Sequence, residues 1–116
     1  MLSSTDDYYL TGNKLMVTET TLSIMDDNVL LKIKPEGVGS WMNTILASRL
    51  AKSAEEWARL FMTNSARTYS CQWMIVDYNR FKKGSPTQSK GLFWILEDVP
   101  SAFVSQDMTE HLLKHR

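Results

Sequence analysis

Cys71 is the first candidate for a reactive residue in this chain, because it is the only cysteine and begins the mostly apolar run CQWMIV. A thiolate is a good nucleophile, but it needs a group that removes its proton. His111 and His115 are the only histidines, and their spacing to Cys71 does not demand such a pair, so we expect them on the surface. A Cys–His pair is therefore the lesser alternative. We interpret Cys71 as a small, half-buried residue on a sheet.

Two threonines next to a carboxylate form a second candidate. Thr20 and Thr21 follow Glu19 in the stretch TETT, residues 18–21. On a strand, their hydroxyls could line a polar pocket and hold a substrate carbonyl. Threonine pairs are also good strand formers, so a purely structural role stays open.

Basic residues form two further features. The segment 79–90 holds Arg80, Lys82, Lys83 and Lys90 with no acid among them. Each charge could attract an anionic lipid surface by about 1 kcal/mol, although a solvated hairpin loop is the commoner meaning of such a segment. Arg49 could pair with an acid such as Asp77 or face solvent.

Composition limits the class of protein. The chain has 116 residues, 43% of them apolar, and equal numbers of acidic and basic side chains, as one modest globular domain does. The longest apolar runs, 73–76 and 92–96, are far shorter than the roughly 20 residues of a membrane-spanning helix. The start MLSSTDDYYL does not have the basic and then apolar pattern of a signal peptide.

The motifs of several other functions are missing from the sequence. We find no glycine-rich phosphate loop, no metal-ligand spacing of Cys and His, and no basic–aromatic interleaving of the nucleic-acid kind. We therefore expect no cofactor, no bound metal and no nucleic-acid partner.

The elements that must position these residues follow from apolar periodicity and turn signals. Strands at both ends flank a central helix pair, and the sequence shows no repeat. The expected elements are a hairpin over 8–25 turning at Gly12-Asn13, an extended run at 29–34, helices at 41–51 and 54–63, strands at 71–78 and 91–99, and a helix at 105–115.

The helix pair carries its own start signals. Ser40 is a plausible N-cap, and Ser53 with Glu56 has the form of a capping box. Spacings of three, four and seven place the large apolar residues on one helical face. These residues are Trp41, Ile45, Leu46, Leu50, Trp57, Leu60 and Phe61, and we expect Trp41, with Trp73 and Trp94, to lie in the core.

The final two predicted strands indicate whether this chain forms a complete domain. Its nearly continuous apolar runs indicate a sheet buried on both faces. The helices of this chain would cover one face only, so the other apolar face would be exposed. We therefore expect a segment of a larger protein.

Motifs along almost the whole chain resemble those of the phospholipase B-like family in order and spacing. They are SSTDDYY at 3–9, TETT at 18–21, the spacing from Pro35 through Ser40-Trp41 to SRLA at 48–51, EWARLF at 56–61, NSARTYSCQWMIVDY at 64–78 and GLFWILEDVP at 91–100. The block QWMIVDY is the most specific of these.

The resemblance implies an α+β fold, specifically part of the αββα sandwich of N-terminal-nucleophile hydrolases, with mostly antiparallel strands and a central helix pair. Residues 1–116 would be a single segment of that larger domain, and the remainder of the same precursor would be its partner. The resemblance further implies a secreted or lysosomal glycoprotein that cleaves itself to expose a cysteine, here expected upstream of residue 1. The implied substrate is phospholipid, from which fatty acyl groups are removed, although an amidase-type activity would suit the fold equally well.

The same resemblance assigns the candidate site. In this enzyme class the nucleophile's own α-amine is the base, so the nucleophile must be a free N-terminus. Cys71 would qualify only if the bond after Ser70 were cut. Asn64 and Tyr69 match the family pattern NSxxTY and, with Thr20 and Thr21, are the candidate site walls. A turn asparagine and a packed tyrosine explain them nearly as well.

Four residues differ from the family pattern, and these differences could lower catalytic activity. Ser70 and Cys71 stand where the resemblance predicts two asparagines, Arg67 where it predicts a glycine, and Leu22 where it predicts a polar residue. Losing one donor to an oxyanion typically costs on the order of 100- to 1000-fold in turnover. The alternative to an acyl hydrolase segment is therefore an inactive scaffold that binds lipid or a partner chain.

One prediction follows from the incomplete sandwich. Expressed alone, the 116-residue chain should be poorly soluble or oligomeric, because half a sandwich exposes its core. Light scattering measures this directly. A monodisperse monomer with a cooperative melt would contradict the prediction.

Overall fold

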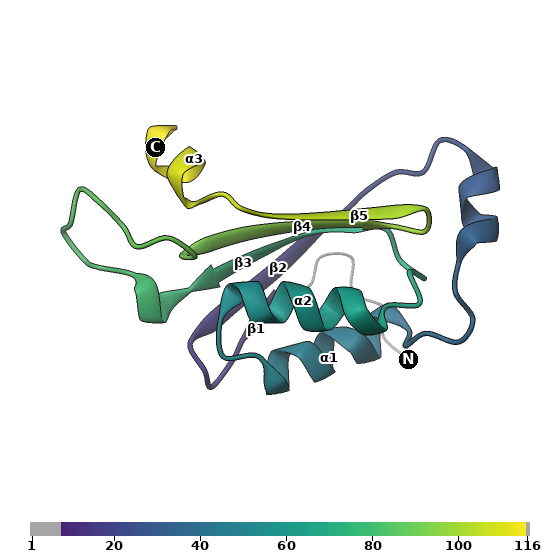
Figure 1. Ribbon diagram of the computed structural model, residues 1–116, viewed down its shortest axis with the longest axis horizontal. Helices are drawn as coiled ribbons and strands as arrows, with labels where there is room; N and C mark the ends of the chain where they lie inside the picture. The colour runs from purple at the N-terminus through teal and green to yellow at the C-terminus, as the bar shows by residue number, and fades with distance from the viewer. Residues whose placement is uncertain (1–7, 116) are drawn as a thin grey trace.

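A single antiparallel sheet organises the chain. The computed structural model describes residues 8–115, so most of the motif at 3–9 lies outside the described residues. The five strands lie side by side in the order of the sequence, β1 to β5 (Figure 1). They are β1 (Tyr8–Leu10), β2 (Leu15–Thr21), β3 (Cys71–Asp77), β4 (Phe93–Val99) and β5 (Ala102–Asp107).

Two helices cover one face of this sheet. In Figure 1, α1 (Ser40–Leu50) and α2 (Ala54–Asn64) lie below the strands, while the short α3 (Thr109–Lys114) lies above one end. Two 3-10 helices, η1 (Asp27–Lys32) and η2 (Tyr78–Arg80), complete the elements. This confirms the α+β class, the mostly antiparallel strands and the central helix pair.

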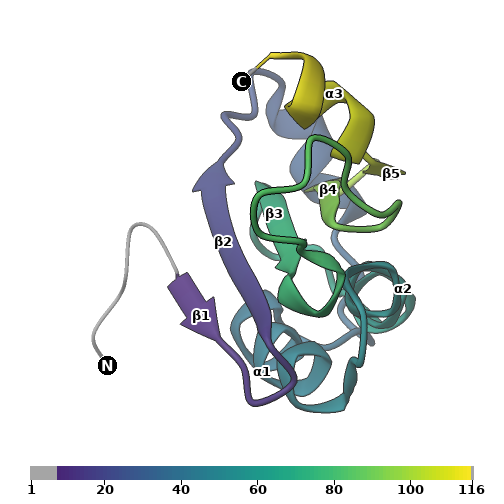
Figure 2. The ribbon, with the colours of Figure 1, turned by 90° about the vertical axis from the view of Figure 1, so that its left-hand side faces the viewer.

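The predicted hairpin forms at the edge of the sheet that Figure 2 shows with β1 outermost. The turn closes where the Lys14 N–H donates to the Thr11 carbonyl at 3.0 Å, and the Thr11 N–H to the Leu15 carbonyl at 2.9 Å. Lys14 adopts the left-handed conformation, with φ 60°. The second strand ends at Thr21, earlier than the predicted 25.

An aromatic cluster joins the helices to the sheet. The Trp57 ring on α2 stacks on Phe61 at 5.2 Å between centroids and meets Trp73 on β3 at 5.3 Å. All three side chains are buried. Burial alternates along β3, with Cys71, Trp73, Ile75 and Asp77 buried and the residues between them half-buried. The core position of Trp73 is confirmed.

The face of the sheet opposite α1 and α2 is less well covered by other elements. Strand register places Met16, Met74, Val76, Phe93 and Ile95 on this outer face, and all are half-buried. The expectation of burial on both faces is therefore met on the helix side only. Among residues 8–115, no helix longer than α3 lies on this outer side (Figure 1).

The caps of the two long helices differ from their predicted form. The Ser53 hydroxyl accepts from the Glu56 N–H at 3.2 Å, as predicted, but the Glu56 carboxylate accepts from the Lys52 N–H at 2.9 Å. Ser40 is wrong as an N-cap: Gly39 holds that position without a side-chain bond. The Ser40 N–H is already engaged, donating to the Thr68 hydroxyl at 3.1 Å.

The orientation of α1 also corrects the prediction. Its buried residues are Ser40, Asn43, Thr44 and Ala47. Its large apolar residues face outward, and Trp41, which we predicted to be in the core, is 64% exposed. The inward polar groups are satisfied, because Asn43 donates to the Phe61 carbonyl at 2.7 Å and Thr44 to the Ser40 carbonyl at 2.8 Å.

Two further segments differ from prediction. The run 29–34, predicted as extended, belongs mostly to η1, because the Asp26 carboxylate caps that turn by accepting from the Asn28 N–H at 3.0 Å. Strand β5 occupies part of the predicted 105–115 helix. The helix begins only at Thr109, where the Asp107 carboxylate accepts from the Thr109 N–H and hydroxyl at 3.0 and 2.6 Å.

The aromatic cluster gives a prediction on stability. Replacing Trp57 with alanine leaves a large cavity between α2 and β3 and should lower the free energy of unfolding by about 3–5 kcal/mol. Phe81→Ala is the matched control, because Phe81 is half exposed on a loop and should cost about 0.5 kcal/mol. Urea unfolding measures both, and equal losses would contradict a core role for Trp57.

Candidate functional site

A pocket of about 270 Å³ lies where β2 ends and β3 begins. Its walls come from four places: the end of β2 with the segment after it, η1 and its C-terminal flank, the segment before β3, and the turn between β4 and β5. The lining residues are Thr21, Leu22, Ile24, Leu30, Ile33, Arg67, Thr68, Tyr69, Ser70 and Pro100. Five of these residues, Leu22, Ile24, Leu30, Ile33 and Pro100, are apolar, and we call them the aliphatic wall, while Thr21, Thr68, Tyr69 and Ser70 carry hydroxyls.

Two predicted site residues meet in this pocket. The hydroxyls of Thr21 and Tyr69 are hydrogen-bonded to each other. Thr21 is the last residue of β2 and pairs with Cys71 on β3. The Leu22 N–H extends this pairing by donating to the Ser70 carbonyl at 2.9 Å. Strand register therefore brings together residues that lie 48 positions apart.

Ser70 adds a polar group that the sequence had indicated only as a departure from the family pattern. The residue is 7% exposed, and its hydroxyl has no hydrogen-bond partner among residues 8–115. A buried hydroxyl without a partner costs free energy, on the order of 1–3 kcal/mol. Because Ser70 lines the pocket, a ligand group that accepts its proton would remove this cost.

A buried polar cluster lies behind the pocket. The Ser65 hydroxyl donates to Asp98 Oδ2 at 2.9 Å and accepts from the Arg67 N–H at 3.0 Å. Arg67 Nε lies 3.9 Å from Asp98 Oδ1, and the guanidinium lies 4.7 Å from the centre of the Phe103 ring. This cluster ties the segment before β3 to strands β4 and β5.

Two features of the cluster are unusual. Arg67 has φ 58°, a backbone conformation that favours glycine, as the resemblance predicted for this position. Burial raises the pKa of Asp98 above its ordinary value of 3.8, although the Ser65 hydrogen bond and the Arg67 charge act in the opposite direction. Asp98 therefore holds a proton more tightly here than in water.

The other two predicted wall residues lie outside the pocket. Thr20 pairs with Gln72 on the outer face, because neighbouring residues of a strand point to opposite sides. Asn64 ends α2, where its side chain donates to the Leu60 carbonyl at 3.4 Å and its carbonyl accepts from the Val38 N–H at 2.7 Å. The structure thus gives Asn64 a role in ending the helix.

Cys71 and the histidines lie at opposite ends of the sheet. Cys71 is fully buried, its thiol 3.5 Å from the Tyr69 carbonyl, and it pairs with Asp98 near the end of β4. His111 is exposed on α3, which follows the far end of β5, and His115 is exposed directly after that helix, with the two rings 4.4 Å apart. This placement rules out a direct Cys–His pair in this structure.

The structure also shows which partners the charged side chains of Asp77 and Arg80 have. Asp77 forms its ion pair with Arg80 at 3.4 Å, so the suggested pairing of Asp77 with Arg49 is wrong. Arg80 also donates to the Lys90 carbonyl at 2.9 Å, which ties together the two ends of the basic loop. Within residues 8–115, no three acidic, histidine or cysteine side chains gather as a metal site, and no helix is long and apolar enough to cross a membrane.

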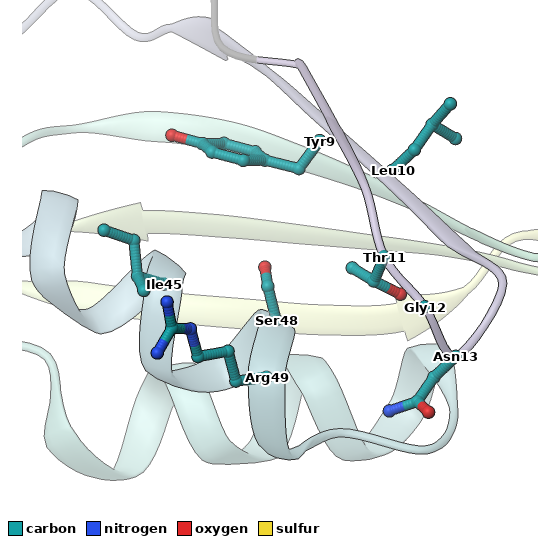
Figure 3. A pocket seen from close by; sticks show the side chains of 8 residues that line it. All are labelled: Tyr9, Leu10, Thr11, Gly12, Asn13, Ile45, Ser48 and Arg49. Atoms are coloured by element: carbon teal, nitrogen blue, oxygen red, sulfur yellow. The ribbon is translucent and has the colours of Figure 1, made fainter.

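A second concavity, of about 420 Å³, lies between the β1–β2 turn and α1 (Figure 3). Tyr9 and Leu10 border it on the strand side, and Ile45, Ser48 and Arg49 on the helix side. The one hydroxyl from α1, that of Ser48, accepts from Trp57 Nε1 at 3.0 Å. No predicted catalytic residue lies here.

Comparison with known proteins decides the family. The sequence matches the family model described as Phospholipase B over residues 1–116. This chain belongs to the phospholipase B family. Phospholipase B-like protein B of Dictyostelium discoideum is 41% identical over 111 residues, which are 96% of this chain and 19% of that protein. Phospholipase B-like protein A of the same organism is 44% identical over 108 residues, 93% of this chain and 19% of that protein.

The predicted resemblance to phospholipase B-like proteins is thereby confirmed. Phospholipase B-like protein C of Dictyostelium discoideum is 41% identical over 114 residues, or 97% of this chain and 20% of that protein. The chain thus spans about a fifth of the length of the curated relatives that it matches.

The aliphatic wall was not predicted from the sequence. Leu30 lies in η1 and Ile33 directly follows it, in the segment predicted as extended. The run Asp26-Asp27-Asn28 was the available signal, because such residues commonly cap the start of a helical turn.

The buried carboxyl gives a prediction on pH dependence. Since the pKa of Asp98 is raised on folding, its protonated form favours the folded state below pH 3.8, and this contribution is lost as pH rises through the folded pKa. The stability of the parent chain relative to Asp98→Asn should therefore fall with rising pH. Urea unfolding from below pH 3.8 to neutrality tests this, and parallel curves would contradict it.

Proposed function

We propose that this chain is part of an acyl hydrolase that removes fatty acyl groups from phospholipids, with a cysteine nucleophile outside residues 1–116. The pocket at the end of β2 is the observation that carries the proposal. It places hydroxyl donors next to an aliphatic wall, in a chain of the phospholipase B family. An acyl ester has the same two parts, a polar carbonyl and an apolar chain.

The hydroxyls are suited to stabilise an oxyanion. When a thiolate attacks the ester carbonyl carbon, the carbonyl π electrons move to the oxygen, which becomes negative. One proton of the Thr21–Tyr69 pair is shared between them, so the other can be donated to that oxygen. The unpartnered Ser70 hydroxyl is the second donor. Collapse of the tetrahedral intermediate expels the alcohol, which takes the proton that the nucleophile's α-amine removed from the thiol, and water then hydrolyses the thioester to the fatty acid and the free thiol.

The aliphatic wall is suited to the acyl chain. Leu22, Ile24, Leu30, Ile33 and Pro100 supply the apolar part of the pocket lining. Each buried CH₂ group of a ligand contributes about 0.8 kcal/mol. An acyl chain along this wall would therefore bind chiefly through burial, and the hydroxyls would fix the position of the carbonyl.

The larger context belongs to the same proposal. The half-buried outer face of the sheet supports an αββα sandwich, in which a second sheet from the remainder of the polypeptide would pack against it. The relatives' greater length is consistent with this, since the chain spans about a fifth of it. We extend the proposal to a precursor that exposes its cysteine by cleavage and acts in a secreted or lysosomal setting.

One observation favours the alternative of an inactive scaffold. Ser70 and Cys71 stand where the resemblance predicts two asparagines, and Cys71 is fully buried. If catalysis in this family depends on those amides, the chain retains the fold and the lipid-binding wall without turnover. Fatty acid release by the unsubstituted polypeptide separates the two functions.

The test measures fatty acid release from phospholipid by the longest natural polypeptide that contains residues 1–116. Tyr69→Phe removes a hydroxyl from the pair and should lower kcat by on the order of 100-fold, with a smaller effect on KM. Tyr78→Phe is the matched control, because Tyr78 is 46% exposed against 41% for Tyr69 but lies outside the pocket.

Three outcomes decide the matter. Loss with Tyr69→Phe and none with Tyr78→Phe supports the proposed role. Equal activity of both variants contradicts the role of the hydroxyl pair. No release by the parent polypeptide contradicts the hydrolase and favours the scaffold.

A further inference from the structure

Helix α1 presents its apolar side to solvent. We call this side the α1 outer face and define it by Trp41, Met42, Ile45, Leu46 and Leu50. Their exposed fractions run from 39% for Ile45 to 64% for Trp41. Contiguous apolar patches of this kind on soluble proteins commonly mark interaction sites. The face lies on a long helix whose other side is already packed against α2.

Hydrogen bonds to neighbouring elements prevent the helix from turning this face inward. Asn43 donates to the Phe61 carbonyl at 2.7 Å, and Ser48 accepts from Trp57 Nε1 at 3.0 Å. At its first turn, the Ser40 N–H donates to the Thr68 hydroxyl at 3.1 Å. Rotation would break all three bonds and bury the donors without partners. The outward orientation is therefore part of the folded state.

The groove of Figure 3 continues the α1 outer face toward β1. Ile45 belongs to both surfaces, and Arg49 extends along the helix toward it in Figure 3. Within residues 8–115, Arg49 forms no ion pair. The surface is thus an apolar ridge beside a hollow, with one unpaired positive charge at the border.

We propose that the α1 outer face and this groove dock an apolar segment of the same phospholipase B-like polypeptide, lying outside residues 1–116 and carrying a carboxylate that pairs with Arg49. The length of the relatives argues for this occupant, because about four fifths of each matched protein lies outside the matched region. The inference rests on the longer polypeptide of the proposed function, and it does not depend on catalysis.

Charge argues against an anionic membrane as the occupant. Glu55 and Glu56 lie at the start of α2, directly after the end of α1, and Glu56 accepts from the Lys52 N–H. Glu56 is paired with Arg59 at 3.8 Å, and the basic residues at the face are only Arg49 and the following Lys52, fewer than the cluster of about four or more that binds anionic lipid. An apolar protein segment with one carboxylate matches both the ridge and Arg49.

The test is hydroxyl-radical footprinting of the longest natural polypeptide that contains residues 1–116, read by mass spectrometry. Trp41 and Met42 report on the α1 outer face. Met25 is the internal control, because it is 95% exposed and lies outside that face. We expect Met25 to be labelled readily. Trp41 and Met42 should be labelled several-fold more slowly than the rates expected from their exposed fractions in the structure of residues 8–115.

Other outcomes overturn the proposal. Full labelling of Trp41 and Met42 means that nothing covers the face. Protection that disappears on dilution means that a second copy covers it, and protection only with added phosphatidylcholine–phosphatidylglycerol vesicles means that lipid does. Because footprinting measures coverage and not turnover, a missing hydrolase activity leaves this result unchanged.

A pair of variants provides a second measurement on the same polypeptide. Leu46→Glu places a charge in the proposed contact and should lower the melting temperature. Leu31→Glu, on η1 and 84% exposed, should leave it nearly unchanged. Equal shifts for the two variants would overturn the specific role of the α1 outer face.

Discussion

The contact between Trp73 on β3 and the stacked Trp57–Phe61 pair on α2 is the interaction on which the rest of the structure depends. It holds the helix layer against one face of the sheet and thereby fixes which residues of β3 point inward. Cys71 is one of those residues, which explains why the only thiol is buried. The same register sets the pairing of Thr21 with Cys71 and brings Tyr69 beside the end of β2.

The polar cluster behind the pocket completes this arrangement. Ser65, at the end of α2, is bonded to Asp98 on β4 and to the backbone of Arg67. The segment between α2 and β3 is therefore held at its start by the cluster and at its end by strand pairing. The Arg67 guanidinium lies 3.9 Å from Asp98 and 4.7 Å from the centre of the Phe103 ring, and so joins this segment to β4 and β5. The hydroxyls of Tyr69 and Ser70 depend on that rigid support.

The sequence predicted the elements whose signals are local. The hairpin at Gly12-Asn13, the start of α2 at Ser53, and strands β3 and β4 all follow from turn residues, capping and apolar runs. It failed at α1, because helical periodicity shows that one side is apolar but not which side faces the core. It also missed β5, whose alternating and mostly exposed residues give a weak signal.

The site was predictable only in part. Family resemblance pointed to Thr21 and Tyr69, and the structure joins them, while Thr20 and Asn64 lie elsewhere. Which of two adjacent threonines faces the pocket depends on strand register, which spacing alone does not determine. The aliphatic wall depends on how η1 folds back toward the strand ends, a tertiary contact without a local signal.

The central claim is that this chain belongs to a longer hydrolase whose nucleophile is a cysteine exposed by cleavage. The most direct test is to purify the natural polypeptide that contains QWMIVDY from its source and determine its intact mass and N-terminal sequences. The account predicts a larger processed protein in which one chain begins with cysteine. A single species of the mass of residues 1–116, starting at Met1, would contradict it.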